Sequence, residues 1–150
     1  MPNINRWGPA VWNLFHCMTI NLKDEHFDNA KKLLYKIITN ICFNLPCPDC
    51  KEHASKIIKN INVNSFKTKN DFVIFIFQFH NLVNLKTNKP VLKHDILKQY
   101  ENMNFINVIN EFYIVFNQRY NNQNLIMASF NKNTMLKSFK TDIILFLKYC

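Results

Sequence analysis

The sequence predicts an all-α protein, and three observations support this prediction. Apolar residues recur at three- and four-residue spacing in several segments, which is the pattern of helices that bury one face. No strand–turn–strand signals and no internal repeats occur. Apolar residues make up 48% of the 150 residues and aromatic residues 14%, so the chain is long and apolar enough to form a real core.

Four helices are expected in the first ninety residues. They are residues 8–22, a helix over 24–42 that Asp24 can cap, a helix over 48–60, and one that begins near Asp71 and ends at Asn88-Lys89-Pro90. The last one contains an apolar run, residues 72–77, that could by itself be a buried strand. Its continuation beyond that run without a turn signal favours a helix.

The remaining sequence predicts shorter or less regular helices. A short helix is expected over residues 94–102, and two more near 105–120 and 134–149, with an Asn-rich loop between them. We expect residues 1–103 to form one domain and residues 104–150 to form a helical C-terminal extension of unknown role.

Composition and charge exclude several classes of function. The net charge is +9, but the lysines are scattered and Lys31-Lys32 is the only adjacent basic pair, so we expect no nucleic-acid partner. The Gly-rich nucleotide-binding patterns G-x-G-x-x-G and G-x-x-x-x-G-K-[ST] do not occur. The first residues do not form a signal peptide and no apolar run is long enough to span a bilayer, which predicts a soluble, cytoplasmic protein. In a reducing compartment, five cysteines are expected to be catalytic, metal-binding or buried.

The segment Cys47-Pro48-Asp49-Cys50 places two thiols two residues apart where a helix is expected to begin. Pro48 suits the first helical turn, where a missing N–H costs little. Cys50 shares a helical face with Ala54 and Ile58, so it should face inward, while Cys47 should lie nearer solvent. The positive end of the helix dipole favours the thiolate, which is the form that attacks disulfides.

Such a pair serves thiol–disulfide exchange, zinc binding, or no chemistry at all. A thioredoxin-like interpretation requires a strand before the pair, and helices are expected instead. Zinc requires four ligands; Cys42 and His53 could join Cys47 and Cys50, but no second pair follows. The alternative function is therefore a zinc-bound or metal-free helical interaction module without catalysis.

A second polar cluster occurs on the otherwise apolar fourth helix. His80 and Asn84 are one helical turn apart, Asn81 is adjacent, and Lys86 and Lys89 follow. A histidine and an asparagine whose hydrogen bonds are made within the protein at a helix end would explain the cluster without a ligand. A planar heteroaromatic ligand would also explain it, because amides can bond ring and ribose edges and lysines can approach phosphates. Trp12 and His16 could then form a second wall, although aromatic residues at this spacing are more often core.

Three motifs occur in a fixed order: Trp7-Gly8-x-x-x-Trp12-x-x-x-His16, Cys47-x-x-Cys50 and His80-Asn81-x-Val83-Asn84-x-Lys86. Together they resemble the Erv/ALR family of FAD-linked sulfhydryl oxidases over about the first 100 residues. The resemblance implies a bundle of four helices plus a short fifth helix, with FAD lodged among them. It also implies an enzyme that oxidises protein dithiols to disulfides and passes electrons through FAD to oxygen, giving hydrogen peroxide.

The resemblance assigns roles to individual residues. Cys50 would be the flavin-proximal thiol, and Cys47 the interchange thiol that meets the substrate. The FAD site would be lined by Gly8, Trp12, His16, His80, Asn81, Val83, Asn84 and Lys86. Lys89 and Tyr100 are candidates for the phosphate and adenine ends. Phe75 stands where the family often has a tryptophan, and keeps an aromatic wall without the indole N–H.

The resemblance also implies partners and a setting. The substrates would be protein dithiols or a small redox carrier protein, and the oxidase a homodimer. The compact form is similar to those of large DNA viruses, which implies the host cytoplasm or the virion. Among the other cysteines, Cys17 and Cys42 are expected to be buried, inert thiols, with a bridge between them as an alternative. Cys150 is a candidate shuttle thiol or a bystander.

Overall fold

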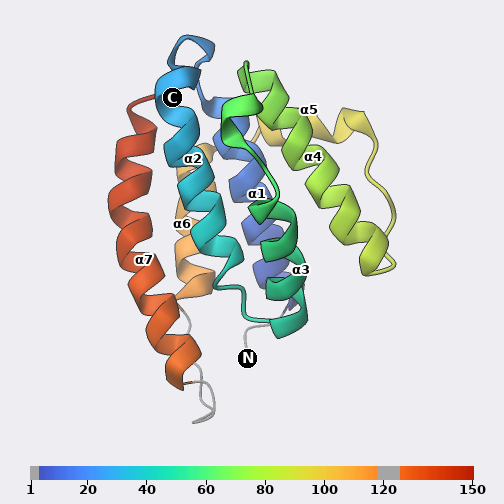
Figure 1. Cartoon of the computed structure of the whole chain (residues 1–150), viewed down its shortest axis with the longest axis vertical. Coiled ribbons are helices and arrows are strands. Elements are labelled where there is room, and N and C mark those ends of the chain that lie inside the picture. The colour runs from blue at the N-terminus through green and yellow to red at the C-terminus, as the bar shows by residue number, and fades with distance from the viewer. Residues whose placement is uncertain (1–3, 118–125) are drawn as a thin grey trace.

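The computed structural model describes residues 4–117 and 126–150, and every regular element within them is helical (Figure 1). The all-α prediction is therefore confirmed. The elements are α1 (Ile4–Asn21), η1 (Asp24–His26), α2 (Phe27–Cys42), α3 (Pro48–Lys59), η2 (Val63–Ser65), α4 (Lys69–Lys86), η3 (His94–Ile96), α5 (Leu97–Glu101), α6 (Phe105–Phe116) and α7 (Ile126–Leu147), where η marks a short 3₁₀ helix.

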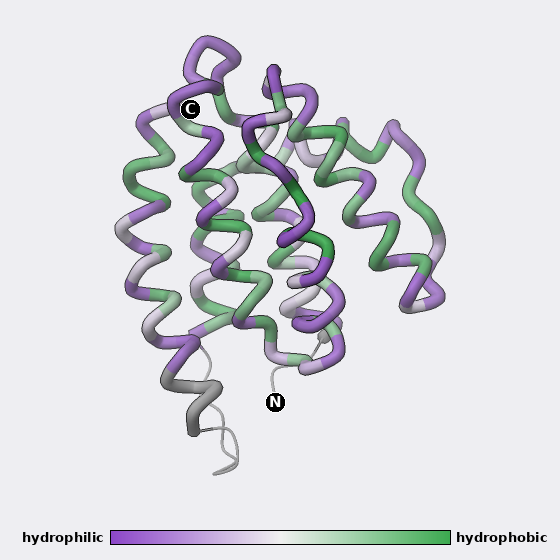
Figure 2. The backbone as a smooth tube through the Cα atoms, in the orientation of Figure 1, coloured by the Kyte–Doolittle hydropathy of each residue, from purple (hydrophilic) through white to green (hydrophobic). Residues whose placement is uncertain are grey.

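Helix α1 lies at the centre of the bundle. It packs against α2, α4, α5 and α6, while α2 also packs against α3 and α7. In Figure 1, α7 and α2 form one side of the molecule and α4 with α5 the other. Hydrophobic and hydrophilic residues alternate along the helices, as in helices that bury one face (Figure 2). The resulting core includes Leu14, Phe72 and Phe112, which are fully buried.

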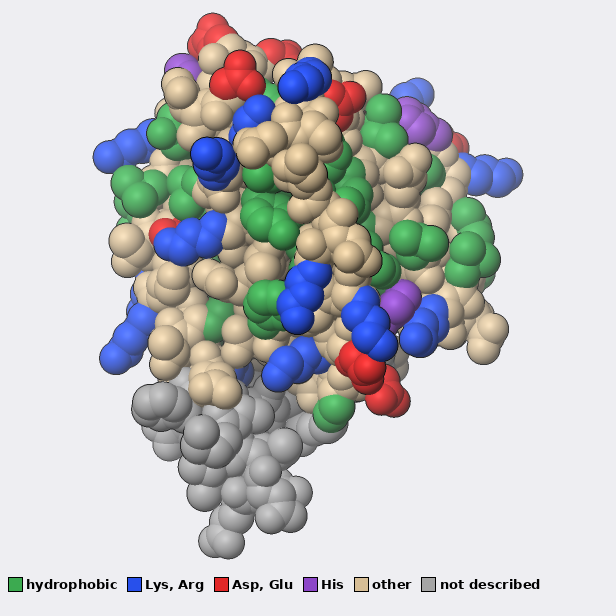
Figure 3. All heavy atoms as spheres, in the orientation of Figure 1, with side chains coloured by type: hydrophobic (Ala, Val, Ile, Leu, Met, Phe, Trp, Pro, Cys, Tyr) green, Lys and Arg blue, Asp and Glu red, His purple; other side chains and the backbone are tan. Residues whose placement is uncertain are grey.

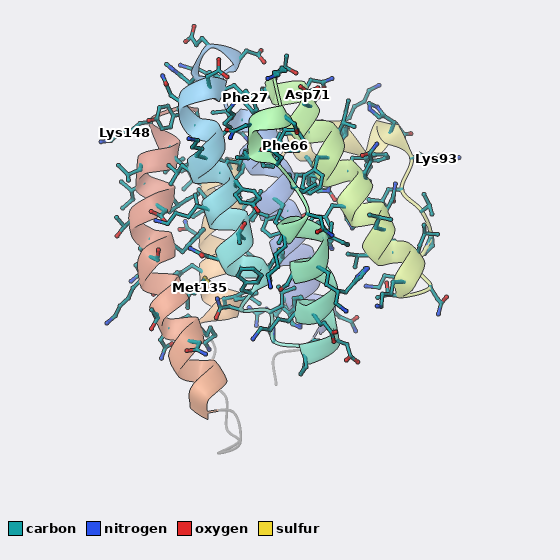
Figure 4. The ribbon with its side chains drawn as sticks, in the orientation of Figure 1. Phe27, Phe66, Asp71, Lys93, Met135 and Lys148 are labelled. Carbon is teal, nitrogen blue, oxygen red and sulfur yellow. The ribbon has the colours of Figure 1, made fainter. Side chains whose placement is uncertain are left out.

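The starts of α3 and α4 follow from their local sequences. Cys47 is the N-cap of α3, and Pro48 occupies the first turn as predicted. At α4, the Asp71 N–H donates to Thr68 Oγ1 at 3.2 Å, while Asp71 Oδ2 accepts from the Thr68 N–H at 3.0 Å, which completes a capping box. Asp71, labelled in Figure 4, therefore lies inside the first turn of α4.

The predicted cap by Asp24 is wrong. Asp24 begins the short helix η1, and α2 starts three residues later, with His26 at its N-cap position and no side-chain capping bond. The short helix η1 lies between α1 and α2. Asp24 therefore belongs to η1 and not to the N-terminus of α2, where the apolar spacing had placed it.

The C-terminal helices share the core of the other helices. Helix α6 packs against α1 and α7 packs against α2. Phe112, Phe116 and Phe146 are fully buried in the same cluster as residues of α1 and α2. Lys36 of α2 donates to the buried Asp142 of α7 at 3.1 Å. A domain boundary at residue 103 stays a prediction.

Two further observations concern the surface. Within residues 4–117 and 126–150, no helix combines the length and apolar character needed to cross a bilayer. On the face shown in Figure 3, lysine side chains occur over several helices with uncharged surface between many of them. Lys93, labelled in Figure 4, projects from the outer edge of the loop that follows α4.

Candidate functional site

A cavity of about 660 Å³ lies beside the cysteine pair, between α1, α3, α4, α5 and the loop after α4. This volume is within the range of small-molecule and cofactor sites. Much of the wall is aromatic or aliphatic, with Trp12 and Phe79 among its larger rings. The structure brings these predicted site residues together around it: Gly8, Trp12, Cys50, His80, Val83, Asn84, Lys86, Lys89 and Tyr100.

The two cysteines lie on different sides of the cavity wall. Cys50 lines the cavity, as its helical face predicts, whereas Cys47 does not. Cys47 Sγ accepts the Cys50 backbone N–H at 3.3 Å, so it is held at the N-terminus of α3 as the capping group. The two sulfur atoms are within bonding reach of each other. A helix N-terminus stabilises negative charge on such a sulfur, which favours thiol–disulfide exchange.

His80 and His16 form a buried pair at the cavity wall. His16 Nε2 and His80 Nδ1 are 2.9 Å apart. The His80 ring is stacked on Trp12 with ring centroids 4.1 Å apart, and the His16 ring is stacked on Tyr100 at 4.0 Å. His80 lines the cavity, but the fully buried His16 does not. His16 therefore lies behind His80, and Trp12 alone supplies the wall that was expected from both residues.

Both histidines are held neutral near pH 7. Burial, and then the neighbouring His80, lower the pKa of His16 to about 3. Burial, and then the ammonium of Lys89, lower the pKa of His80 to about 4. The two neutral rings can therefore share one hydrogen bond, with one ring as donor and the other as acceptor.

Asn81 and Asn84 hold the loop that forms the outer wall. Asn81 Nδ2 donates to the Leu92 carbonyl at 3.2 Å, and Asn81 Oδ1 accepts the Leu92 N–H at 2.8 Å. Asn84 Nδ2 donates to the Pro90 carbonyl at 3.2 Å. Asn88 has a φ of 57°, a conformation that asparagine tolerates better than most residues, and this turns the chain back. Pro90 and Leu92 then line the cavity together with Lys89, although Asn81 itself does not.

Phe75 also lies away from the cavity. Its ring packs beside those of Phe72 and Phe79 on α4 and of Phe66 in the segment before α4. The aromatic wall that α4 contributes is Phe79, whose ring meets Trp12 edge-on at 5.2 Å. One helical turn separates Phe75 from Phe79, so the two rings lie on the same face of α4, and a direct role for Phe75 at the ligand stays a prediction.

The sequence missed several cavity residues, of which His53 is the most informative. It follows Cys50 by three residues, so both side chains lie on one helical face and both line the cavity. Burial lowers its pKa, and the ammonium groups of Lys86 and Lys56 lower it further. Helical spacing from Cys50 could have identified it. Trp7, the first residue of the first motif, also lines the cavity, whereas others, including Asn13, Leu45 and Thr87, had no comparable signal.

The other three cysteines are free. Cys17 and Cys42 are buried and unbridged, and burial raises the pKa of Cys17 to about 11 and that of Cys42 further still. Burial also raises the pKa of Cys150 to about 11. The C-terminus lies at the end of the bundle opposite the start of α3 (Figure 1), so a shuttle from Cys150 to Cys47 stays a prediction that needs a second molecule.

No group of three or more His, Cys, Asp or Glu side chains within the described ranges is arranged to hold a metal ion. The ligand set considered for zinc, Cys42 and His53 with Cys47 and Cys50, is therefore not assembled there.

Comparison with known proteins places this site in a family. The model of the Erv1 / Alr family matches residues 9–102. The chain is 31% identical to a protein of Invertebrate iridescent virus 3 named "Putative FAD-linked sulfhydryl oxidase 096R" over 87 residues, which are 57% of this chain and 59% of that protein. It is 29% identical to the FAD-linked sulfhydryl oxidase of African swine fever virus (isolate Tick/Malawi/Lil 20-1/1983) over 103 residues, 69% of this chain and 86% of that protein.

A third relative, from Monkeypox virus and also named as an FAD-linked sulfhydryl oxidase, is 35% identical over 82 residues, 53% of this chain and 82% of that protein. No solved structure matches the chain. The family match spans more than half of the chain and includes the cysteine pair, both buried histidines and the loop held by Asn81. The protein therefore belongs to the Erv1 / Alr family.

Proposed function

We propose that this protein is an FAD-dependent sulfhydryl oxidase that converts protein dithiols to disulfides and passes the electrons through FAD to oxygen, giving hydrogen peroxide. The observation that supports it most is the division of the cysteine pair: Cys50 lines a large cavity, while Cys47 caps the helix outside it. Such a pair can take electrons from a substrate on one side and deliver them to a group in the cavity on the other. The relatives' names, FAD-linked sulfhydryl oxidase, support the oxidation of thiols and the use of FAD.

The cavity residues fit FAD in shape and charge. Apolar rings such as Trp12 and Phe79 suit the flat flavin and adenine systems. Lys86 and Lys89, at the end of α4 and in the following loop, suit the two phosphates. Gly8 lines the cavity, and a Cβ added there would meet no atom within 4 Å, so space beside α1 is open to a ligand. When bound, FAD would supply the two-electron chemistry that links thiols to oxygen.

We assign the exchange chemistry to the two cysteines. A substrate thiolate attacks Cys47 Sγ of the oxidised pair, forms a mixed disulfide and releases Cys50 as a thiolate. The second substrate thiolate then attacks the substrate sulfur of that mixed disulfide and releases Cys47. Two substrate thiols thus lose two electrons and become a disulfide, while the pair gains two electrons and two protons. Cys50 then lies on the cavity side, where FAD would accept those electrons.

The remaining roles are assigned by position. His80, Val83, Asn84 and Tyr100 line the cavity and would contact FAD directly. His16, Asn81 and Phe75 lie behind the wall and would act through their neighbours. We further propose protein dithiols or a small redox carrier protein as substrates, a homodimer as the functional form, and the host cytoplasm or virion as the location. In this account residues 1–103 hold the reaction site and residues 104–150 complete the core.

The test is oxygen consumption by protein reconstituted with FAD, with dithiothreitol and then a reduced protein as substrate. We expect stoichiometric FAD, oxygen uptake that depends on the dithiol, and hydrogen peroxide as the product. Cys47→Ser and Cys50→Ser should each retain FAD and lose dithiol oxidation, whereas Cys17→Ser, remote from the pair in sequence, should keep it. A protein that binds no FAD, or a Cys50→Ser variant with full turnover, would contradict the proposal.

A further inference from the structure

The buried pair formed by His16 and His80 fixes where each ring holds its proton. A neutral imidazole has one N–H and one bare nitrogen, so the 2.9 Å contact between His16 Nε2 and His80 Nδ1 contains one hydrogen. If His16 donates it, then His80 must hold its own proton on Nε2. If His80 donates it, then His80 Nε2 is bare and His16 must hold its proton on Nδ1.

The surroundings of His16 distinguish these two arrangements. His16 Nδ1 is buried and has no hydrogen-bond partner among the described residues. Donation by His80 would leave a buried N–H on that atom without an acceptor, and orphaned buried N–H groups are the rarer kind of unsatisfied group. It would also put both rings in the Nδ1–H form, which is the less stable tautomer of neutral histidine in water. Donation by His16 puts both rings in the more stable Nε2–H form.

Stacking and the hydrogen bond between them hold the two rings in this arrangement. The His80 ring is stacked on Trp12 with an angle of 6° between the planes, and the His16 ring is stacked on Tyr100 at 10°. One stacked neighbour thus fixes the plane of each ring, and a flip within that plane would put a carbon where the bonded nitrogen lies and break the 2.9 Å contact. Since Nδ1 of His80 is taken by His16, Nε2 is the nitrogen of this cavity-lining residue that remains for a ligand.

We propose that His16 is a positioning residue that donates its Nε2–H to His80 Nδ1 and thereby makes His80 Nε2–H a fixed hydrogen-bond donor towards the cavity. This N–H would bind an uncharged acceptor atom of the ligand, namely a ring nitrogen or a carbonyl oxygen of a heteroaromatic group. That ligand assignment rests on the proposed function, since FAD offers such acceptors on both of its ring systems. The tautomer assignment rests only on the protein and holds without ligand.

The first test uses the FAD-free protein at pH 7, uniformly labelled with ¹⁵N. Long-range ¹H–¹⁵N spectra of histidine side chains distinguish bare from protonated ring nitrogens. We expect His80 to show a bare Nδ1 and a protonated Nε2, and His16 the same. A bare Nε2 on His80 would overturn the proposal, whatever FAD does. Failure of the protein to bind FAD at all would instead overturn the proposed function and leave this result standing.

Two variants of similar side-chain length test the donor itself. His16→Gln keeps an N–H donor that can reach His80, whereas His16→Met has none. We expect the Gln variant to keep His80 in the Nε2–H form, and the Met variant to show a mixture of both tautomers with about tenfold weaker FAD binding than the Gln variant, the loss of roughly one hydrogen bond. His94→Met, an exposed histidine outside the cavity, should change neither.

A His16→Met variant with an unchanged His80 tautomer and unchanged affinity would overturn the proposal. If His16→Met does not fold, a bare Nε2 on His80 in the wild-type spectrum remains the result that overturns the proposal.

Discussion

Asn81 and Leu92 bind each other in both directions: the Asn81 amide donates to the Leu92 carbonyl at 3.2 Å and accepts the Leu92 N–H at 2.8 Å. This pairing uses the amide oxygen and one of the two amide hydrogens of Asn81, so only the second amide hydrogen remains as a donor for a ligand. Its place in the His-Asn-x-Val-Asn motif is explained by the loop that it holds, because that loop supplies Lys89, Pro90 and Leu92 to the cavity wall.

Removing the two hydrogen bonds between Asn81 and Leu92 should first of all loosen the loop that follows α4. We expect Asn81→Ala to speed hydrogen exchange of the Leu92 amide in the FAD-free protein and to weaken FAD binding about tenfold, because two hydrogen bonds of roughly 1 kcal/mol or less are lost and the loop must be ordered on binding. Gln78→Ala, an exposed site on the same helix, is the control. An unchanged hydrogen-exchange rate of the Leu92 amide in Asn81→Ala would contradict this role of Asn81.

Gly8 offers a variant that separates folding from ligand binding. It lies within α1, where alanine is the better helix former, and an added Cβ would meet nothing within 4 Å. We expect Gly8→Ala to raise the stability of the FAD-free protein by about 0.5–1 kcal/mol. Gly8→Leu should leave that stability close to wild type but weaken FAD binding, because the longer side chain occupies space at the cavity wall. Thermal melts and FAD titrations measure the two effects, and equal FAD affinity in all three proteins would contradict this placement of the ligand.

The neutral histidines make stability depend on pH in a defined direction. As the pH falls below about 6.5, the unfolded chain protonates His16 and His80, whereas the folded protein keeps them neutral until their lowered pKa values of about 3 and 4. The unfolded state therefore binds more protons, and stability falls with falling pH through this window, by about 2 kcal/mol per histidine at pH 5.

Melting temperatures of the FAD-free protein between pH 7 and pH 5 test this dependence, since most carboxylates stay ionised in that range. The His16→Gln variant should lose less stability over the same interval, because one of the two groups is gone. A decline of equal size in both proteins would show that His16 does not contribute.

The contact between α2 and α7 tests whether residues 104–150 belong to the fold. Asp142 is buried and accepts from Lys36 at 3.1 Å and from Ser138 Oγ at 3.2 Å, whereas the Lys36 side chain is half exposed. We expect Asp142→Ala to destabilise the protein by about 1–3 kcal/mol, because it leaves polar partners unsatisfied at the α2–α7 contact. Lys36→Met should cost less, about 0–1 kcal/mol, since its exposed end can be solvated. Denaturant unfolding measures both, and equal small effects would indicate that α7 contributes little to the stability of the bundle.

The sequence predicted those features that depend on local chemistry. Pro48 and the Cys-x-x-Cys spacing located the start of α3 and the inward face of Cys50, and both are found in the structure. Thr68 and Asp71 together define the start of α4, but only Asp71 was identified, because a capping box needs both partners to be considered. Asp24 failed as a cap because a short 3₁₀ helix precedes α2, and such helices leave little trace in apolar periodicity.

The features that depend on tertiary contacts could not be predicted. The sequence identified His16 and Asn81 as ligand contacts because they share motifs with residues that line the cavity, and Phe75 because it stands where the family often has a tryptophan. In the structure they support those residues from behind, and only the distances to His80, Leu92 and Phe79 reveal it. In the same way, the spacing of apolar residues predicted helices after residue 104, but not that they would cover α1 and α2.

The most direct test of the central claim is the visible absorption of the FAD-loaded protein when a dithiol is added without oxygen. If electrons pass from the substrate through Cys47 and Cys50 to FAD, the flavin band of the wild type should bleach and return when air is admitted. Cys50→Ser should retain its colour under the same conditions. A wild-type spectrum that does not change, or a Cys50→Ser protein that bleaches at the same rate, would contradict the account.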